Sequence, residues 1–256
     1  MVSVVLFGLV IGSFLNVCIY RVPRKISLVN PVFSFCPQCN TNIRVSENIP
    51  VLSWIIQKGK CAHCDQKISF VYPLVELLSA AFAVLSYATF GLTATGIIVY
   101  VVCASLIVIS FIDFEFKIIP NVISFPGIIF GLLLGIASQF SNIVVWPLTH
   151  SALDSLLGMI VGGGFFYLIG FSYYLVTKRV GLGGGDVKLM AMTGAILGIE
   201  SIAPTIFCGS LIGAIIGITL IAAKKGGRHT EIPFGPWLSV GTMVYIFFDP
   251  QVFRFF

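Results

Sequence analysis

Apolar residues fill long stretches of the chain, and charged residues fall almost entirely between those stretches. Most stretches approach the length of about 20 residues that a helix needs to cross a bilayer. The pattern therefore predicts eight apolar helical segments. They are Val2–Tyr20, Phe70–Phe90, Thr95–Ile112, Pro120–Ser138, Ala152–Thr177, Val187–Ile199, Ile202–Ala223 and Pro233–Phe248.

The sixth segment is short for a membrane span. It becomes long enough only if the glycine-rich stretch Gly181–Asp186 also lies at membrane depth. Irregular backbone is tolerated at that depth only inside protein or beside water. The pattern thus indicates that this stretch contributes to a functional site.

Composition supports a membrane location. Hydrophobic residues make up 57% of the 256 residues and charged residues only 10%, against roughly 25% charged residues in an ordinary soluble domain. So few charges could not cover a soluble globule, which excludes a water-soluble enzyme, a disordered chain and a nucleic-acid binder with a basic surface. We predict an all-α polytopic membrane protein with lipid as a partner and no nucleic acid.

The basic residues indicate the orientation. Arg21, Arg24 and Lys25 follow the first segment rather than precede it, so this segment is expected to be a retained span and not a cleaved signal. If all eight segments cross, 14 of the 15 Lys and Arg residues fall on one side, and only Arg254 lies on the other. The positive-inside rule then places the N-terminus outside and the basic loops in the cytoplasm.

The polar region Arg21–Ser69 contains two pairs of cysteines, Cys36 and Cys39 in the first and Cys61 and Cys64 in the second. Four thiolates in two CxxC pairs can close a tetrahedral zinc site. Two disulfides are the alternative, but thiols stay reduced in the cytoplasm. Because metal binding supplies folding energy to a region with little core, we predict a structural Zn²⁺ on these four cysteines.

Two acids, Asp113 and Asp186, lie at one membrane depth and on one side, in different predicted helices. Two carboxylates that meet share a proton, so one acts as a base and the other as an acid. Such a pair can activate water against a peptide carbonyl. Considered singly, Asp186 could instead be a helix N-cap, and Asp113 could pair with Lys117 four residues later.

Several short motifs occur together in a defined order. They are Gly12–Val17 with Arg21-Val22-Pro23, the two CxxC pairs, Ile49–Trp54, Gly59-Lys60-Cys61, Tyr72–Glu76, Asp113 with Ile119-Pro120-Asn121, and Gly183–Lys188. In this order the chain resembles the bacterial type IV prepilin peptidases, also called leader peptidase/N-methyltransferases, which are GxGD-type aspartic proteases. The likeness extends over essentially the whole chain.

The resemblance implies eight spans and catalytic roles for Asp113 and Asp186. It implies cleavage of the short basic leader of type IV pilins and type II secretion pseudopilins at the cytoplasmic face of the bacterial inner membrane. It also implies methylation of the new N-terminal residue with S-adenosylmethionine. The expected domains are residues 1–20 as the first span, 21–69 as a zinc subdomain linked to methylation, and 70–256 as the peptidase.

Other residues have less defined expected roles. Gly183, Gly185 and Lys188 are expected to support the dyad, and Glu76 either pairs with a loop lysine or lines the site. The methyl-donor site is not identified, with Gly59 and Lys60 as the only candidates for a role in methylation. Two positions depart from the family pattern, because Asn121 replaces a frequent Asp and Phe116 a frequent His.

Two alternative functions remain at this point. The first is a peptidase that has lost methylation, since no glycine-rich nucleotide-binding signature marks a donor site. The second is a small transporter that uses the two aspartates as a proton relay. A transporter would be expected to carry acids near mid-membrane and to show internal repeats, whereas here both acids lie at the cytoplasmic edge and no repeat is evident.

Overall fold

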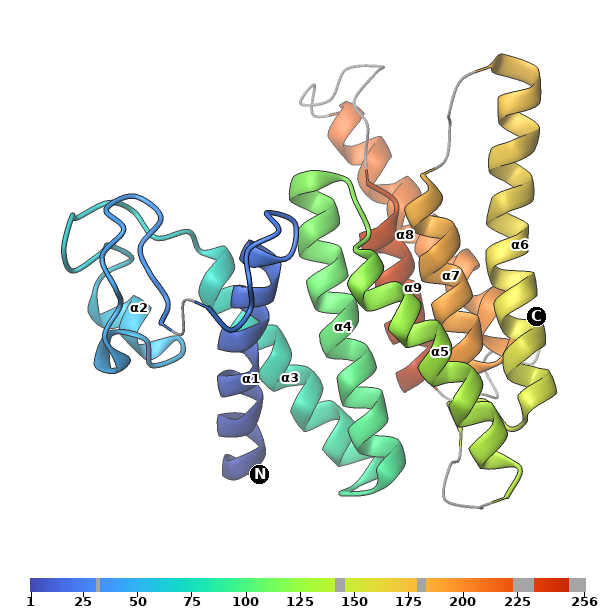
Figure 1. The fold of residues 1–256 in the computed structure, drawn as a ribbon, viewed down its shortest axis with the longest axis horizontal. Coiled ribbons are helices and arrows are strands. Elements are labelled where there is room, and N and C mark those ends of the chain that lie inside the picture. Colours follow the sequence, from blue (N-terminus) through green and yellow to red (C-terminus); the bar gives the residue numbers. More distant parts are fainter. Residues whose placement is uncertain (31–32, 141–145, 179–182, 223–232, 249–256) are drawn as a thin grey trace. The chain divides into compact units, whose positions relative to one another are not determined.

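The protein is helical. A computed structural model describes residues 1–30, 33–140, 146–178, 183–222 and 233–248. Within these ranges there is no β-strand, only two isolated bridges in the cysteine region. The helices are α1 (Val2–Arg21), α2 (Leu52–Ile56), α3 (Val71–Phe90), α4 (Ala94–Phe116), α5 (Asn121–Ser138), α6 (Ala152–Thr177), α7 (Gly184–Leu197), α8 (Ile202–Ala222) and α9 (Gly235–Phe247), with the short 3₁₀ helices η1 (Val45–Glu47) and η2 (Ile199–Ser201) (Figure 1). The all-α prediction is therefore confirmed.

Each of the eight predicted apolar segments coincides with a helix. Six helical segments of the described chain are long and apolar enough to cross a membrane. α7 and α9 have only 14 and 13 residues, which at about 1.5 Å per residue is shorter than the roughly 30 Å of a bilayer core. Eight crossings therefore stay a prediction. Parts of that prediction depend on residues that lie outside the described ranges. They are Arg179, Gly181, Leu182, Ala223, Lys224, Lys225, Arg228 and Arg254.

The third predicted segment differs at its end. α4 continues past Ile112 to Phe116, because the Asp113 carbonyl still accepts a hydrogen bond from the Lys117 N–H at 2.9 Å. The helix stops where Lys117 takes a left-handed conformation with φ of 55°. Asp113 consequently lies in the last turn of α4.

The contacts divide the chain into two compact units, residues 1–108 and 109–256, with α4 running through the boundary. In the first unit, α1 packs along α3 (Figure 1). Gly8 permits this approach, because a Cβ there would lie 2.5 Å from the Ala80 Cα. The Ser79 hydroxyl donates to the Gly8 carbonyl at 2.8 Å and also contacts the Tyr100 hydroxyl at 2.9 Å. Small residues and hydroxyl groups are typical of helix contacts in membranes.

In the second unit, α7 packs against α5 and α6. Gly158 of α6 and Gly194 of α7 bring their backbones into direct contact, and a Cβ at either residue would collide with the other. The Ser155 hydroxyl lies 2.7 Å from the Ala195 carbonyl oxygen. The Asp154 carboxylate accepts the Ile199 N–H at 2.9 Å. These contacts fix the C-terminal half of α7, so they also fix where its first turn lies.

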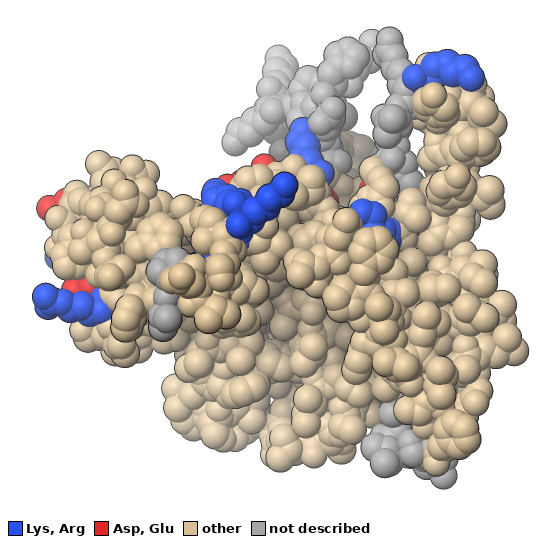
Figure 2. All heavy atoms as spheres, in the orientation of Figure 1, with Lys and Arg blue, Asp and Glu red and all other residues tan. Residues whose placement is uncertain are grey.

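The outward faces of the helices are apolar. Side chains such as Leu133, Leu168 and Ile218 are 59%, 63% and 67% exposed. Figure 2 shows that the helical flanks in view are almost free of charged atoms, which gather in the loop region and at helix ends. Exposed apolar surface of this extent is rare on soluble monomers and fits contact with lipid.

Candidate functional site

Asp113 and Asp186 are brought to the same end of the second unit. Asp113 lies in the last turn of α4 and Asp186 in the first turn of α7, and their exposed fractions are only 6% and 8%. They are close enough for the charge of Asp113 to act on Asp186. Asp113 Oδ2 accepts a hydrogen bond of 3.2 Å from the Gly235 N–H at the start of α9. Three helices thus meet around the two carboxylates.

The N-cap interpretation of Asp186 is wrong. The N-cap of α7 is Gly183, and the Asp186 N–H donates to the Gly183 carbonyl at 3.1 Å. The carboxylate therefore stays available for other contacts in the first turn. The start of a helix carries partial positive charge, so the beginnings of α7 and α9 both favour negative charge at this site.

Two glycines allow these helix starts to come close. A Cβ at Gly185 would lie 3.1 Å from the Ile119 side chain, and a Cβ at Gly235 would lie 2.6 Å from Asp113 Oδ2. Gly185 was expected to support the site, but sequence reasoning missed Gly235. Its only local signal is the Gly235-Pro236 pair at the start of the last apolar segment, where proline is typical of a first helical turn.

Lys188 connects α7 to the start of α5. Its Nζ donates to Asn121 Oδ1 at 2.6 Å and lies 5.8 Å from the centre of the Phe125 ring. With Asn121 this contact is an ammonium–amide hydrogen bond, whereas an Asp at this position would make it an ion pair. The contact holds α7 two residues beyond Asp186.

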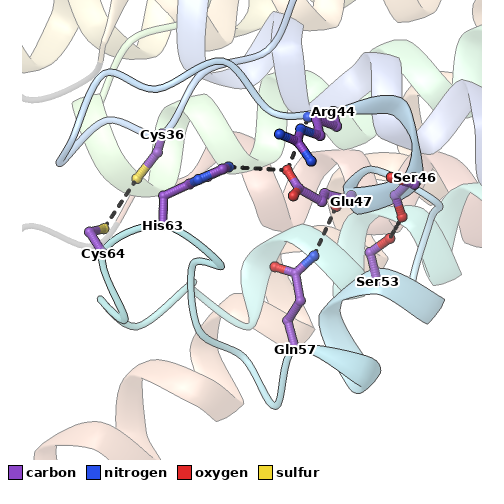
Figure 3. Close-up of polar contacts among 8 residues, drawn as sticks. All are labelled: Cys36, Arg44, Ser46, Glu47, Ser53, Gln57, His63 and Cys64. Atoms are coloured by element: carbon purple, nitrogen blue, oxygen red, sulfur yellow. Dashed lines mark hydrogen bonds and ion pairs between the residues drawn. The ribbon is translucent and has the colours of Figure 1, made fainter.

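The four predicted metal ligands converge in the first unit. The sulfur atoms of Cys36, Cys39, Cys61 and Cys64 all lie within 4.8 Å of one another, and Cys36 and Cys64 are 4.0 Å apart (Figure 3). A tetrahedral zinc with Zn–S bonds of about 2.3 Å needs sulfur atoms about 3.8 Å apart. All seven cysteines of the chain are free in the structure, which favours the metal site over the disulfide alternative. The donor set fits a structural zinc ion.

The two cysteine loops have the same backbone design. The first cysteine of each pair donates its N–H to the carbonyl five residues later, Cys36 to Thr41 and Cys61 to Gln66. The residue after the second cysteine is left-handed in both loops, with φ of 54° at Asn40 and 55° at Asp65. Hydrogen bonds from Thr41 lower the pKa of Cys39 to about 6, which favours the thiolate that binds metal.

His63 does not face the sulfur atoms. Its Nε2 lies 3.3 Å from Glu47 Oε2, and Figure 3 shows the ring directed at that carboxylate. The Arg44 N–H donates to the same oxygen at 3.1 Å, and this hydrogen bond, with His63 beside it, lowers the pKa of Glu47. Glu47 therefore links the second cysteine loop to η1.

Known proteins match the chain over almost its whole length. Residues 6–90 match the bacterial peptidase A24 N-terminal domain and residues 100–218 the type IV leader peptidase family. Proteins named prepilin leader peptidase/N-methyltransferase are 35% identical in Neisseria gonorrhoeae and 30% identical in Pseudomonas putida, each match covering 96% of this chain and 90% of the relative. The chain belongs to the type IV leader peptidase family. The protein of that name from Pseudomonas aeruginosa is 33% identical over 98% of this chain and 91% of its own length.

No solved structure matches the chain significantly. Family membership and the six apolar helices together make this type IV leader peptidase a multi-pass membrane protein.

The first unit also contains a cavity of about 330 Å³. Its wall includes Tyr20 of α1, Trp54 of α2, and Tyr72 and Glu76 of α3. Glu76 is only 7% exposed, and its Oε2 accepts the Val51 N–H at 2.7 Å. Glu76 thus meets the loop through a backbone group rather than through a lysine.

Val51 adopts an unusual backbone conformation. Its φ is 60°, and the Leu52 N–H donates to the Pro50 carbonyl at 2.6 Å in a tight γ-turn. Positive φ is strained for a β-branched residue, and such strain gathers at functional sites. The turn directs the Val51 N–H at Glu76. Apart from Pro50, which precedes it, no residue in the sequence indicates this turn.

Gly59 and Lys60 lie elsewhere in the subdomain. Gly59, with φ of 67°, packs under the Trp54 ring, and Lys60 forms an isolated bridge with Lys67. Neither is among the described residues that line the cavity. Gly59 therefore supports a wall residue without facing the cavity itself.

Proposed function

We propose that this protein cleaves the leader of type IV prepilins and type II secretion pseudopilins and then methylates the new N-terminal residue. The relatives that match over nearly the whole chain carry both activities in their name. The observation that carries the peptidase part is the pair of buried carboxylates, Asp113 and Asp186, at the meeting point of α4, α7 and α9.

The two aspartates would share one proton during cleavage. The ionised carboxylate takes a proton from water, and the water oxygen attacks the carbonyl carbon of the scissile peptide. The protonated carboxyl gives its proton to the carbonyl oxygen. When the tetrahedral intermediate collapses, the C–N bond breaks and the leaving nitrogen takes up a proton. The Gly235 N–H donates a hydrogen bond to one oxygen of Asp113 and so orients this carboxyl for proton transfer.

Methyl transfer then acts on the amine that cleavage releases. The nitrogen lone pair bonds to the methyl carbon of S-adenosylmethionine, the carbon–sulfur bond breaks, and its electrons remain on sulfur as a neutral thioether. The amine loses one proton to a base. Residues 21–69 are the part of the chain that we assign to this activity, and residues 70–256 carry the peptidase.

The cysteine cluster would hold zinc as a structural ion. Cys36, Cys39, Cys61 and Cys64 supply all four ligands, and a closed tetrahedral site leaves no position for substrate. Zinc would supply folding energy to residues that otherwise have few buried side chains. Its role is therefore to fix the two cysteine loops against η1 and α2.

We place the protein in the bacterial inner membrane with eight crossings, the N-terminus outside and the active site at the cytoplasmic face. Support comes from the one-sided distribution of basic residues, since 14 of 15 fall in the loops or at the helix ends that this topology makes cytoplasmic.

The decisive experiment uses the purified protein, a prepilin and S-adenosylmethionine labelled in its methyl group. Mass spectrometry of the product reads cleavage and methylation separately. Loss of the leader together with one added methyl group supports the proposal. Cleavage without methylation would leave a peptidase only, and an intact prepilin would refute both parts.

A further inference from the structure

We propose that the cavity in the first unit binds the methyl donor, with Glu76 as the counter-charge of its sulfonium. This inference rests on the proposed methyl transfer and adds a location for it. The cavity volume of about 330 Å³ lies within the range of about 300–1,000 Å³ that is usual for small-molecule sites.

A buried carboxylate is the first support for a cationic ligand. Glu76 is more than nine-tenths buried, and the hydrogen bonds to its carboxylate come from neutral groups, the Val51 N–H and the Ser13 side chain. A carboxylate out of water is costly unless an opposite charge pairs with it. A sulfonium ion placed in the cavity would supply that charge.

The aromatic wall is the second support. Tyr20, Trp54 and Tyr72 line the cavity from three different helices. Aromatic faces attract cations and also stack on flat rings such as adenine. The Trp54 indole is held in place, since its Nε1 donates to the Ile68 carbonyl at 3.3 Å and its ring contacts Phe70 edge-on.

A basic residue on the same wall can pair with the carboxylate of the methyl donor. Lys67 lines the cavity, and S-adenosylmethionine carries a carboxylate as well as its sulfonium. A wall with both an acid and a base matches a ligand with both charges. The strained γ-turn at Val51 has a purpose in this arrangement, because it aims a donor at Glu76 and so fixes the carboxylate.

The experiment compares two ligands that differ in charge at sulfur. Calorimetry on the purified full-length protein measures Kd for S-adenosylmethionine and for the neutral thioether S-adenosylhomocysteine. Glu76→Gln keeps the size and the acceptor for the Val51 N–H but removes the charge. This substitution should raise the Kd of S-adenosylmethionine about tenfold and the Kd of the thioether less than about twofold, as expected for loss of a charge-assisted contact.

Lys67→Gln tests the other end independently. It should raise the Kd of both ligands by a similar factor, because both ligands carry the carboxylate. Asp65→Asn and Lys58→Gln are the matched controls, since each removes one charge from the same subdomain at a residue outside the cavity wall. Both should bind each ligand as the wild type does. The melting temperature of every variant checks that it is folded.

The outcomes separate the two proposals. If the wild type methylates a prepilin but Glu76→Gln binds both ligands unchanged, the donor site lies elsewhere and the cavity assignment is overturned. An equal loss for both ligands in Glu76→Gln would also overturn the role of Glu76 as counter-charge. If the wild type neither binds the donor nor methylates, the methyl-transfer function fails and this inference with it.

Discussion

Asp113 and Asp186 have different surroundings although both are buried. Asp113 lies in the last turn of the long helix α4 and accepts a hydrogen bond from Gly235. Asp186 lies in the first turn of the short helix α7, follows three glycines and is close enough for the charge of Asp113 to act on it. Carboxylates in unequal environments are suited to the unequal roles of acid and base.

The first prediction concerns these two residues. Asp113→Asn and Asp186→Asn should each lower prepilin cleavage at least about a thousandfold, because an amide cannot move a proton for the pair. Cleavage is measured by the loss of the leader on a gel and by product mass. Glu115→Gln, two residues from Asp113 in α4, is the matched control and should cleave normally. Substantial cleavage by either Asn variant would contradict the assignment of both aspartates as a catalytic pair.

At the scale of elements, the two cysteine loops bring four sulfur atoms within 4.8 Å of one another. Their regular backbone contacts are a few turns and the two isolated bridges. A small region of this kind needs a cross-link such as a disulfide or a structural metal ion to stay folded. The metal site should therefore control the order of the whole subdomain.

The second prediction follows from that dependence. The wild type should contain about one zinc per chain, and Cys36→Ser with Cys39→Ser should release it. Methylation should then fall by a larger factor than cleavage, since the aspartates lie on other elements. Metal analysis, proteolysis of residues 21–69 and the two activities are the measurements. Cys208→Ser, a cysteine outside the cluster, should keep the zinc. Wild-type protein without zinc would contradict the prediction.

The third prediction concerns the contact between α6 and α7. Gly158→Ala should lower the free energy of unfolding by about 1–3 kcal/mol, because the added methyl group collides with the Gly194 backbone. The displacement of α7 should also reduce cleavage, since α7 carries Asp186. Gly164→Ala in the same helix meets nothing within 4 Å and should leave stability equal or slightly higher. Equal melting temperatures for both variants would show that the contact is not tight.

At the scale of the whole molecule, the topology is the main open prediction. Alkaline phosphatase is active only outside the cytoplasm, so a fusion after His150 should be active and a fusion after Lys117 inactive. The reason is the positive-inside rule applied to eight crossings. Fluorescent-protein fusions at the same two positions should give the opposite pattern. An active phosphatase after Lys117 would invert the assigned topology.

The sequence alone predicted most of the helical architecture of this molecule. The predicted segment Ala152–Thr177 matches α6 residue for residue, and the first apolar segment differs from α1 by one residue. Helices in apolar stretches can be predicted in this way because their hydrogen bonds are local. The pairing of the cysteines into one cluster was also predictable, because the CxxC spacing restricts which atoms can share a metal.

Only the tertiary structure decided which distant residues meet. The Gly235 N–H reaches Asp113 across 122 residues of sequence, and the γ-turn at Val51 reaches Glu76 across 25. Neither contact has a sequence signal, because each depends on how separate helices pack rather than on the residues beside it. The apolar pattern could place Asp113 and Asp186 at one depth. The hydrogen bond from Gly235 of α9 to Asp113, the close approach of Gly185 to Ile119 and the packing of α7 against α9 decide that they come together.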